Sequence, residues 1–322
     1  MTLKFASTDV DTFVLGDWGS TRLRLFLCAS NDVVDQQAGV GIGELEASAE
    51  STFFHLIEPW RREHGTMPVF LAGMVGSRNG WREAPYLHCP ADARALSGAL
   101  TRITARGHEI AIAPGLACTN PQGAPDVMRG EETQILGALS QDPSLRQGRR
   151  LMVLPGTHAK WVVVEGGRIE IFQTSLAGEL HALLRQRSSL LSVAPGASHA
   201  DPSPHPRDYF DLGLERCRER EQASLLHLLF EVRTRQLLEG ISHEQALAYL
   251  SGLIIGQDVL AALPLFDCID NAHPVVMIGA PQLNVMYGAS LSKHGVTALP
   301  LDGAEMSLAG LKALARHELQ TS

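Results

Sequence analysis

The chain has 322 residues, a formal net charge of −8 and a sequence pI of about 5.9. This acidic balance disfavours a nucleic-acid-binding face, which requires clustered Lys and Arg, whereas a hydrophobic content of 45% is enough for a sizeable core. The five cysteines are widely spaced and form no Cys-x-x-Cys motif, which argues against a disulfide framework or a zinc site and favours a reducing compartment.

The first half of the chain alternates predicted strands and helices. An apolar run at residues 13–16 ends at Asp17, a Gly-Ser-Thr turn follows, and residues 23–28 read as the next strand. The later elements are a strand that begins at 33–34, a helix over 44–64, strands over 68–75 and 109–113, and an apolar helix over 135–139.

The second half repeats this order. Its predicted strands cover residues 151–154, 161–164, 169–174, 274–279 and 295–300, and its predicted helices cover 178–191, 208–238, 243–263 and 308–319. Both halves begin with a strand, a turn that contains Gly and Ser or Thr, and two further strands, which indicates a duplicated α/β domain. A coincidental likeness within one large α/β sheet is the alternative.

A domain boundary is expected in the polar stretch 141–150, which gives domains at 1–145 and 146–322. Small ligands commonly bind in clefts between domains. Residues 194–206 are rich in Pro, Ser, His and Ala and read as a loop or mobile flap.

Neither a targeting signal nor a membrane span is expected. Residues 1–12 contain Lys4, Asp9 and Asp11 and lack an apolar signal core. Apolar runs such as 253–266 are interrupted by polar residues and proline. We therefore expect a cytoplasmic protein with small-molecule partners and leave its oligomeric state open.

The turn Asp17-Trp18-Gly19-Ser20-Thr21 is a candidate phosphate and metal site. A carboxylate at the end of a buried strand could hold Mg²⁺. Gly19 lets the backbone approach a phosphate, and the hydroxyls of Ser20 and Thr21 add donors. An ordinary hairpin turn, in which Asp17 bonds to local N–H groups, explains the same residues equally well.

A matching turn stands in the second half, where Gly156 and Thr157 are followed by Lys160. Two such turns, one in each half, could hold the β- and γ-phosphates. Neither turn fits the P-loop pattern, so a P-loop fold is not expected. His158 is read as a structural residue.

The segment Met128-Arg129-Gly130-Glu131-Glu132 is the densest polar cluster. Glu131 or Glu132 could accept a proton from an attacking hydroxyl, and Arg129 could bind a carboxylate or a phosphate. A solvated helix start, where acidic residues interact favourably with the helix dipole, is the alternative.

Two turns that follow predicted strands add weaker candidates. Ser77 and Arg78 could reach a substrate from the carboxyl end of the strand at 68–75, with Tyr86 as a pocket wall. Gly279 opens a turn that would suit the adenine and ribose of a nucleotide. Ordinary packing accounts for both turns about as well.

Together these segments resemble the 2-dehydro-3-deoxygalactonokinase family, within the actin-like ATPase superfamily. The segments that carry the resemblance are DWGST (17–21), AGMVGS (72–77), APYL (84–87), MRGEETQ (128–134), PGTHAKW (155–161), AGEL (177–180), LFEVR (229–233) and SGLIIG (251–256). Residues 1–12 look like an extension beyond the usual start of the family, and 190–206 match nothing recognisable.

The resemblance implies an α/β fold with two actin-like (ribonuclease H-like) lobes and a central ATP cleft. It also implies Mg²⁺ as a cofactor, and phosphorylation of 2-dehydro-3-deoxy-D-galactonate at its 6-hydroxyl in galactonate catabolism. The catalytic base is assigned to Glu131, with Glu132 and Asp126 as alternatives. A kinase for the gluco epimer or a hexose, and a sensor that binds nucleotide or sugar without turnover, are the competing functions.

Overall fold

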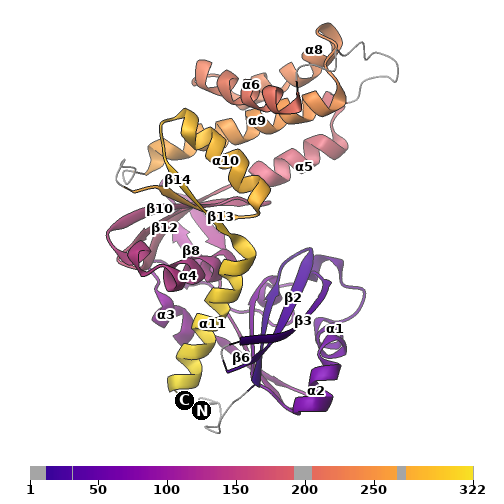
Figure 1. The fold of residues 1–322 in the computed structure, drawn as a ribbon, viewed down its shortest axis with the longest axis vertical. Coiled ribbons are helices and arrows are strands. Elements are labelled where there is room, and N and C mark those ends of the chain that lie inside the picture. The colour runs from indigo at the N-terminus through magenta and orange to yellow at the C-terminus, as the bar shows by residue number, and fades with distance from the viewer. Residues whose placement is uncertain (1–11, 31, 192–204, 267–272, 322) are drawn as a thin grey trace. The chain divides into compact units, whose positions relative to one another are not determined.

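The computed structural model describes residues 12–30, 32–191, 205–266 and 273–321 (Figure 1). Most of the extension at 1–12 and most of the segment at 194–206 lie outside these described residues. The expectation of a flap at 194–206 therefore stays a prediction.

The first sheet is six-stranded, with the order β3-β2-β1-β4-β7-β6. Its strands are β1 (Thr12–Trp18), β2 (Arg22–Ala29), β3 (Asp32–Val40), β4 (Val69–Gly73), β6 (Thr101–Ala105) and β7 (His108–Ile112). β1 pairs antiparallel with β2 and parallel with β4, and β4 pairs parallel with β7. The apolar runs of β1 and β4 are buried along most of their length, as expected for central strands covered on both faces.

The second sheet has the order β12-β11-β10-β13-β14. Its strands are β10 (Arg149–Leu154), β11 (Ala159–Glu165), β12 (Arg168–Ser175), β13 (Val275–Gly279) and β14 (Ala298–Asp302). This order repeats that of β3-β2-β1-β4-β7, and β10 pairs parallel with β13 as β1 does with β4. The predicted fold class, with an actin-like strand order that occurs twice, is confirmed.

A third, three-stranded sheet was not anticipated. It contains β5 (Leu87–His88), β8 (Leu116–Thr119) and β9 (Pro125–Met128) in the order β5-β8-β9. These strands are too short to produce a recognisable alternation, so sequence periodicity does not reveal them.

The helices divide more finely than the sequence predicts. They are α1 (Ala49–Leu56), α2 (Glu58–His64), α3 (Ala93–Gly98), α4 (Glu131–Gln141), α5 (Ala177–Arg187), α6 (Pro206–Glu219), α7 (Leu225–Leu229), α8 (Glu231–Leu238), α9 (His243–Ala262), α10 (Pro281–Lys293) and α11 (Gly303–Thr321). Short 3₁₀ turns are η1 (Ile42–Glu44), η2 (Met74–Gly76), η3 (Pro143–Arg146), η4 (Ser189–Leu191) and η5 (Leu263–Leu265).

Two predicted helices are interrupted by identifiable residues. The helix predicted at 44–64 is split at Ile57. Pro59 lies in the first turn of the second part, which begins at Glu58, because proline is tolerated only in the first turn of a helix. The helix predicted at 208–238 becomes α6, α7 and α8. Ser224 accepts a hydrogen bond from Leu226 N and so caps a new helix start.

Contacts between residues divide the chain into two compact units. The first unit contains 1–149, 162–172 and 301–322, and the second contains 150–161 and 173–300. The predicted boundary at 145/146 stays a prediction about domain organisation. The core of the first unit includes Trp18 and Phe53, and that of the second includes Tyr249 and Leu253.

The C-terminal helix α11 packs against α4 within the first unit. A Cβ placed on Gly310 would lie 1.8 Å from Thr133 O, and one placed on Gly137 would lie 1.8 Å from Met306 O. Only glycine permits such close contact between the two helix backbones. This contact carries Ser307, on α11, into the first unit.

Within the described residues, His243–Leu265 is the helical stretch long and apolar enough to cross a membrane. More than half of the tested window is buried inside the structure. Gly256, Gln257 and Asp258 interrupt the apolar run but not the helix, and Asp258 itself is buried. Burial in the core of the second unit accounts for the apolar composition.

Candidate functional site

Asp17 lies near the end of β1 and is held by side chains from two other elements. Its Oδ2 accepts hydrogen bonds from Arg24 Nη2 on β2 and, at 2.9 Å, from Ser307 Oγ on α11. Both partners are side chains, not the local N–H groups of an ordinary turn. Sequence reasoning missed Arg24 and Ser307, because only the fold brings them to the carboxylate.

Two backbone hydrogen bonds hold the turn after β1 against the segment after β3. Ile42 N donates to Gly19 O at 3.0 Å, and Gly43 N donates to Ser20 O at 2.9 Å. The side chains of Ser20 and Thr21 are exposed. The turn therefore has a fixed backbone and accessible hydroxyls, as a phosphate-binding turn requires.

The ends of β1 and β4 and the start of α4 meet in the first unit. A Cβ placed on Gly130 would lie 3.5 Å from the Cα of Gly73, and one on Gly73 would lie 3.6 Å from Asp17 Oδ1. Gly73 and Gly130 have φ values of +91° and +106°, a region that favours glycine. The fold thus gathers three segments that the sequence analysis selected separately.

Arg129 is the central cation of this region. Its Nη2 donates to Ala84 O at 2.7 Å, and its guanidinium carbon lies 4.5 Å from the ring centroid of Tyr86. Among the described residues, Arg129 Nε and Nη1 and Ser77 Oγ are buried without a hydrogen-bond partner. An unsatisfied buried donor costs about 1–3 kcal/mol, so these atoms are candidates for ligand contacts.

Arg78 has a different environment. Its side chain is 87% exposed, and its Nε lies 3.7 Å from Glu83 Oε1. The structure thus places Gly76, the residue before Ser77, against Arg129, since a Cβ on Gly76 would lie 2.9 Å from Arg129 Nη1, and it leaves Arg78 at the surface.

The two glutamates of α4 both support the turn before it. Glu131 Oε2 accepts from Arg129 N at 3.1 Å, and Glu132 Oε2 accepts from Gly130 N at 2.7 Å. Glu132 is fully buried, and burial, followed by the charge of Glu131, raises its pKa to about 8. The solvated helix start weighed above is wrong for Glu132.

Asp126, the third alternative for the base, lies on β9. Its Oδ1 accepts from the N–H of the next residue, Val127, at 2.8 Å.

Five residues of the first unit are together called the polar site below: Asp17, Ser77, Arg129, Glu131 and Glu132.

The second candidate phosphate turn, in the second unit, packs on the start of α5. Glu179 N donates to Thr157 O at 2.9 Å, and a Cβ on Gly178 would lie 2.2 Å from Gly156 O. Thr157 is exposed. Gly279 lies beside the same turn, since a Cβ there would be 3.2 Å from Pro155 Cδ.

Lys160 is 4% exposed, and its Nζ donates to His158 O at 3.1 Å. The side chain of this lysine therefore points back to the backbone of the turn that precedes it. The imidazole of His158 is 2.5 Å from Glu179 Oε2, which fits the structural role expected of it.

A pocket of about 200 Å³ opens beside this turn. Its apolar wall includes Ile254 and Ile255 of α9 and Leu283 and Met286 of α10, and Gly156 lies at its edge. The ten lining residues, which we call the apolar pocket, are Gly156, Ala177, Gly178, His181, Ser251, Ile254, Ile255, Leu283, Met286 and Tyr287. Gly279 itself does not line it, although Leu283, four residues later, does.

Tyr287 is held in the pocket wall by a buried carboxylate. Its hydroxyl donates to Asp258 Oδ2 at 2.6 Å, and Trp161 Nε1 donates to Asp258 Oδ1 at 3.3 Å. Burial raises the pKa of Asp258. This brace from α9 was invisible to sequence reasoning, since its three residues are far apart in the chain.

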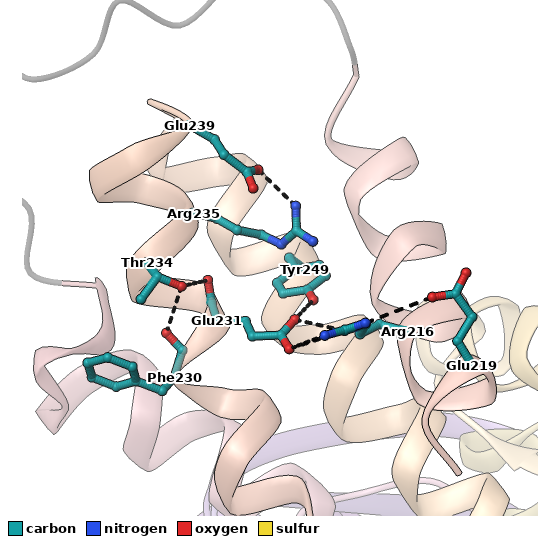
Figure 2. Close-up of polar contacts among 8 residues, drawn as sticks. All are labelled: Arg216, Glu219, Phe230, Glu231, Thr234, Arg235, Glu239 and Tyr249. Carbon is teal, nitrogen blue, oxygen red and sulfur yellow. Dashed lines mark hydrogen bonds and ion pairs between the residues drawn. The ribbon is translucent and has the colours of Figure 1, made fainter. Parts of the chain in front are cut away.

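Figure 2 shows a second polar network in the helical part of the second unit. Arg216 of α6 donates to both carboxylate oxygens of Glu231 on α8, and Tyr249 OH of α9 donates to Glu231 Oε2 at 2.7 Å. Arg235 lies over the Tyr249 ring at 4.8 Å. This network joins α6, α8 and α9 and gives the LFEVR segment a role in helix packing.

The repeated strand order and the two glycine-containing turns place the chain in the actin-like fold class, which includes sugar kinases. The chain belongs to the 2-keto-3-deoxy-galactonokinase family, whose model matches residues 17–314.

Its relatives cover it almost completely. It is 34% identical to the 2-dehydro-3-deoxygalactonokinase of Escherichia coli K12 over 305 residues, which are 94% of this chain and 97% of that protein. It is 35% identical over 306 residues to a protein of Rhizobium meliloti named as a probable 2-dehydro-3-deoxygalactonokinase, with 93% and 95% covered. A crystal structure from Sinorhizobium meliloti, described as that of a candidate 2-dehydro-3-deoxygalactonokinase, superposes with a TM-score of 0.81 at 33% identity, over 95% of this chain and 98% of that one.

Proposed function

We propose that this chain transfers the γ-phosphoryl group of ATP to the 6-hydroxyl of 2-dehydro-3-deoxy-D-galactonate, a step of galactonate catabolism. The observation that carries the proposal is membership of the kinase family over residues 17–314, with the polar site inside that range. The free thiols of Cys28, Cys89, Cys118 and Cys217 are compatible with a cytoplasmic location.

The substrate carboxylate binds at Arg129 and Ser77. Their buried donors have no hydrogen-bond partner among the described residues, and a carboxylate would satisfy them with charge-assisted hydrogen bonds. Tyr86, stacked on the guanidinium, holds Arg129 in place. Arg78, exposed and beside Glu83, is the less suitable candidate.

Glu131 acts as the base in this proposal. It accepts the proton of the 6-hydroxyl while that oxygen forms a bond to the γ-phosphorus, and the bond from the γ-phosphorus to the bridging oxygen of ADP breaks. Glu131 is partly accessible, whereas Glu132 is 1% exposed and bonded to Gly130 N and Thr133 Oγ1. Glu132 therefore holds the turn that presents Arg129.

Asp17 is the residue that would hold Mg²⁺. The described residues contain no cluster of three or more His, Cys, Asp or Glu side chains, which fits an ion held by one carboxylate together with phosphate oxygens and water. When bound, Mg²⁺ neutralises developing charge on the phosphates. Arg24 and Ser307 orient the carboxylate.

The nucleoside binds in the apolar pocket, with Gly156 and Thr157 near its phosphates. Ile254, Ile255 and Leu283 offer the apolar surface that a planar base requires. Because Lys160 faces His158 O, the exposed backbone and hydroxyl of Thr157 are better placed for a phosphate contact than the lysine.

A coupled ADP-release assay tests the function. The purified chain is given ATP and Mg²⁺ with 2-dehydro-3-deoxygalactonate, its gluco epimer, and a panel of neutral hexoses. ADP release with the galacto acid as best substrate supports the proposal. A preference for the gluco epimer or a hexose would assign another substrate, and ATP binding without ADP release would assign a sensor.

A further inference from the structure

The apolar pocket has one polar wall. His181 on α5 and Ser251 on α9 both line it, among the apolar side chains of α9 and α10. His181 Nε2 lies 3.0 Å from Ser251 Oγ. Polar groups placed in an otherwise apolar pocket determine which ligand binds and in which orientation.

Ser251 determines which nitrogen of His181 carries the proton. Ser251 Oγ lies 3.0 Å from Leu247 O. Because a carbonyl only accepts and a hydroxyl has one proton, both contacts are hydrogen bonds when Ser251 donates to Leu247 O and accepts the Nε2–H of His181. A neutral imidazole has a single N–H, so His181 Nδ1 keeps its lone pair and is an acceptor.

The surroundings of His181 keep the ring neutral. Burial, followed by the nearby positive charge of Arg185, lowers the pKa of His181. The imidazole therefore presents a lone pair, not a second N–H, at neutral pH.

We propose that the His181–Ser251 pair selects adenine as the base of the nucleotide, with His181 Nδ1 accepting a hydrogen bond from the exocyclic amine. Hypoxanthine and guanine carry a carbonyl oxygen where adenine carries that amine. Two facing acceptors repel, and the bound base leaves the Nδ1 lone pair without a donor, which a site built for hydrogen bonding penalises. This inference rests on the proposed function, because it takes the apolar pocket as the nucleoside site.

The test compares the binding of ADP and IDP, whose bases differ in the group at C6 and in the proton on N1, by titration calorimetry. We expect the unchanged protein to bind ADP about 10-fold more tightly than IDP, the range of one net hydrogen bond. His181→Phe, similar in size but apolar, should bring the two affinities to within about 2-fold of each other.

Ser251→Ala is the second variant. It keeps the imidazole but removes the hydroxyl that fixes the proton on Nε2, so Nδ1 can carry the proton and donate to the carbonyl of IDP. We expect the preference for ADP over IDP to lie between that of the unchanged protein and that of His181→Phe. His227→Phe, at an exposed position on α7, makes the same chemical change outside the pocket and should leave the ratio unchanged. Thermal unfolding of each variant checks that it is folded.

Equal binding of ADP and IDP by the unchanged protein would overturn the proposal, as would a ratio unaffected by His181→Phe, or no binding of ADP at all. If His181→Phe does not fold, an unchanged ratio in Ser251→Ala overturns it. Failure of the proposed function looks different: the preference for ADP persists, but no ADP is released with any sugar acid.

Discussion

The polar site of the first unit and the apolar pocket of the second differ in how they are built. The polar site consists of four charged residues and one serine, and some of its donors, such as Arg129 Nε and Nη1, have no hydrogen-bond partner among the described residues. The apolar pocket is formed mainly by aliphatic side chains from α9 and α10. A site for a small anion must keep charges buried and ready at a cost in stability, whereas a site for a planar base depends mostly on apolar area.

The largest expected effect is at Asp17. Asp17→Asn removes the charge that would hold Mg²⁺ near the phosphates, and we expect turnover at saturating ATP to fall by about 100-fold, in the range for a lost electrostatic contact to the transition state. Steady-state ADP release measures it. Asp32→Asn, at the exposed start of β3, is the matched control. Near-normal turnover of Asp17→Asn in excess Mg²⁺ would remove Asp17 from the site.

The Arg129→Lys variant tests whether the polar site recognises the carboxylate of the sugar acid. Arg129→Lys keeps a positive charge but loses the planar guanidinium and its contacts with Ala84 O and Tyr86. We expect kcat/KM for the sugar acid to fall by about 30-fold, as for a charge-assisted hydrogen bond.

Arg78→Lys is the control for Arg129, because that side chain is 87% exposed, and its kcat/KM should change by less than about 2-fold. The KM for ATP should stay constant in both variants. The reverse ranking of the two arginines would assign the substrate carboxylate to Arg78.

The Leu283→Ala variant tests whether the apolar pocket binds the nucleoside of ATP. Leu283→Ala removes apolar surface from the wall, and we expect the KM for ATP to rise by about 5- to 10-fold, corresponding to one or two buried methylene groups. The KM for the sugar acid should not change. Val285→Ala on the same helix, where the residue is 64% exposed and outside this pocket, is the control. Equal effects in the two variants would contradict the assignment.

A separate effect, on stability and not on turnover, is the pH dependence expected from Glu132. Burial raises the pKa of its carboxyl from 4.5 to about 8, so the folded state holds a proton that the unfolded state releases above its own pKa. The stabilisation of the folded state that comes from the protonated Glu132 carboxyl is fully present below about pH 4.5 and is lost as the pH rises through about 8.

Glu132→Gln mimics the protonated form and should be free of this loss. Urea unfolding between pH 5 and 9 should therefore show the free energy of unfolding of the variant rising relative to that of the unchanged protein as the pH increases. Parallel pH profiles for the two proteins would show that Glu132 is ionised in the folded state.

Local patterns predicted the elements with long apolar runs or clear turns. The strands at β1, β4 and β13 are apolar along most of their length, so burial on both faces can be read directly from their composition. The pattern did not reveal β5, β8 and β9, which are two to four residues long. It also joined α7 to α8, because the break at Phe230 is apolar and carries no proline or glycine.

The duplicated α/β order and the segments of the polar site follow from the amino-acid sequence alone, because glycine turns, strand ends and helix starts are local features. The burial of Arg129 and the exposure of Arg78, the contact of Ser307 with Asp17, and the hydrogen bond of Lys160 to its own turn all depend on the tertiary structure. Burial and hydrogen-bond partners depend on which distant segments pack together. The Asp17–Ser307 contact, for example, exists because Gly137 and Gly310 let α4 and α11 approach closely.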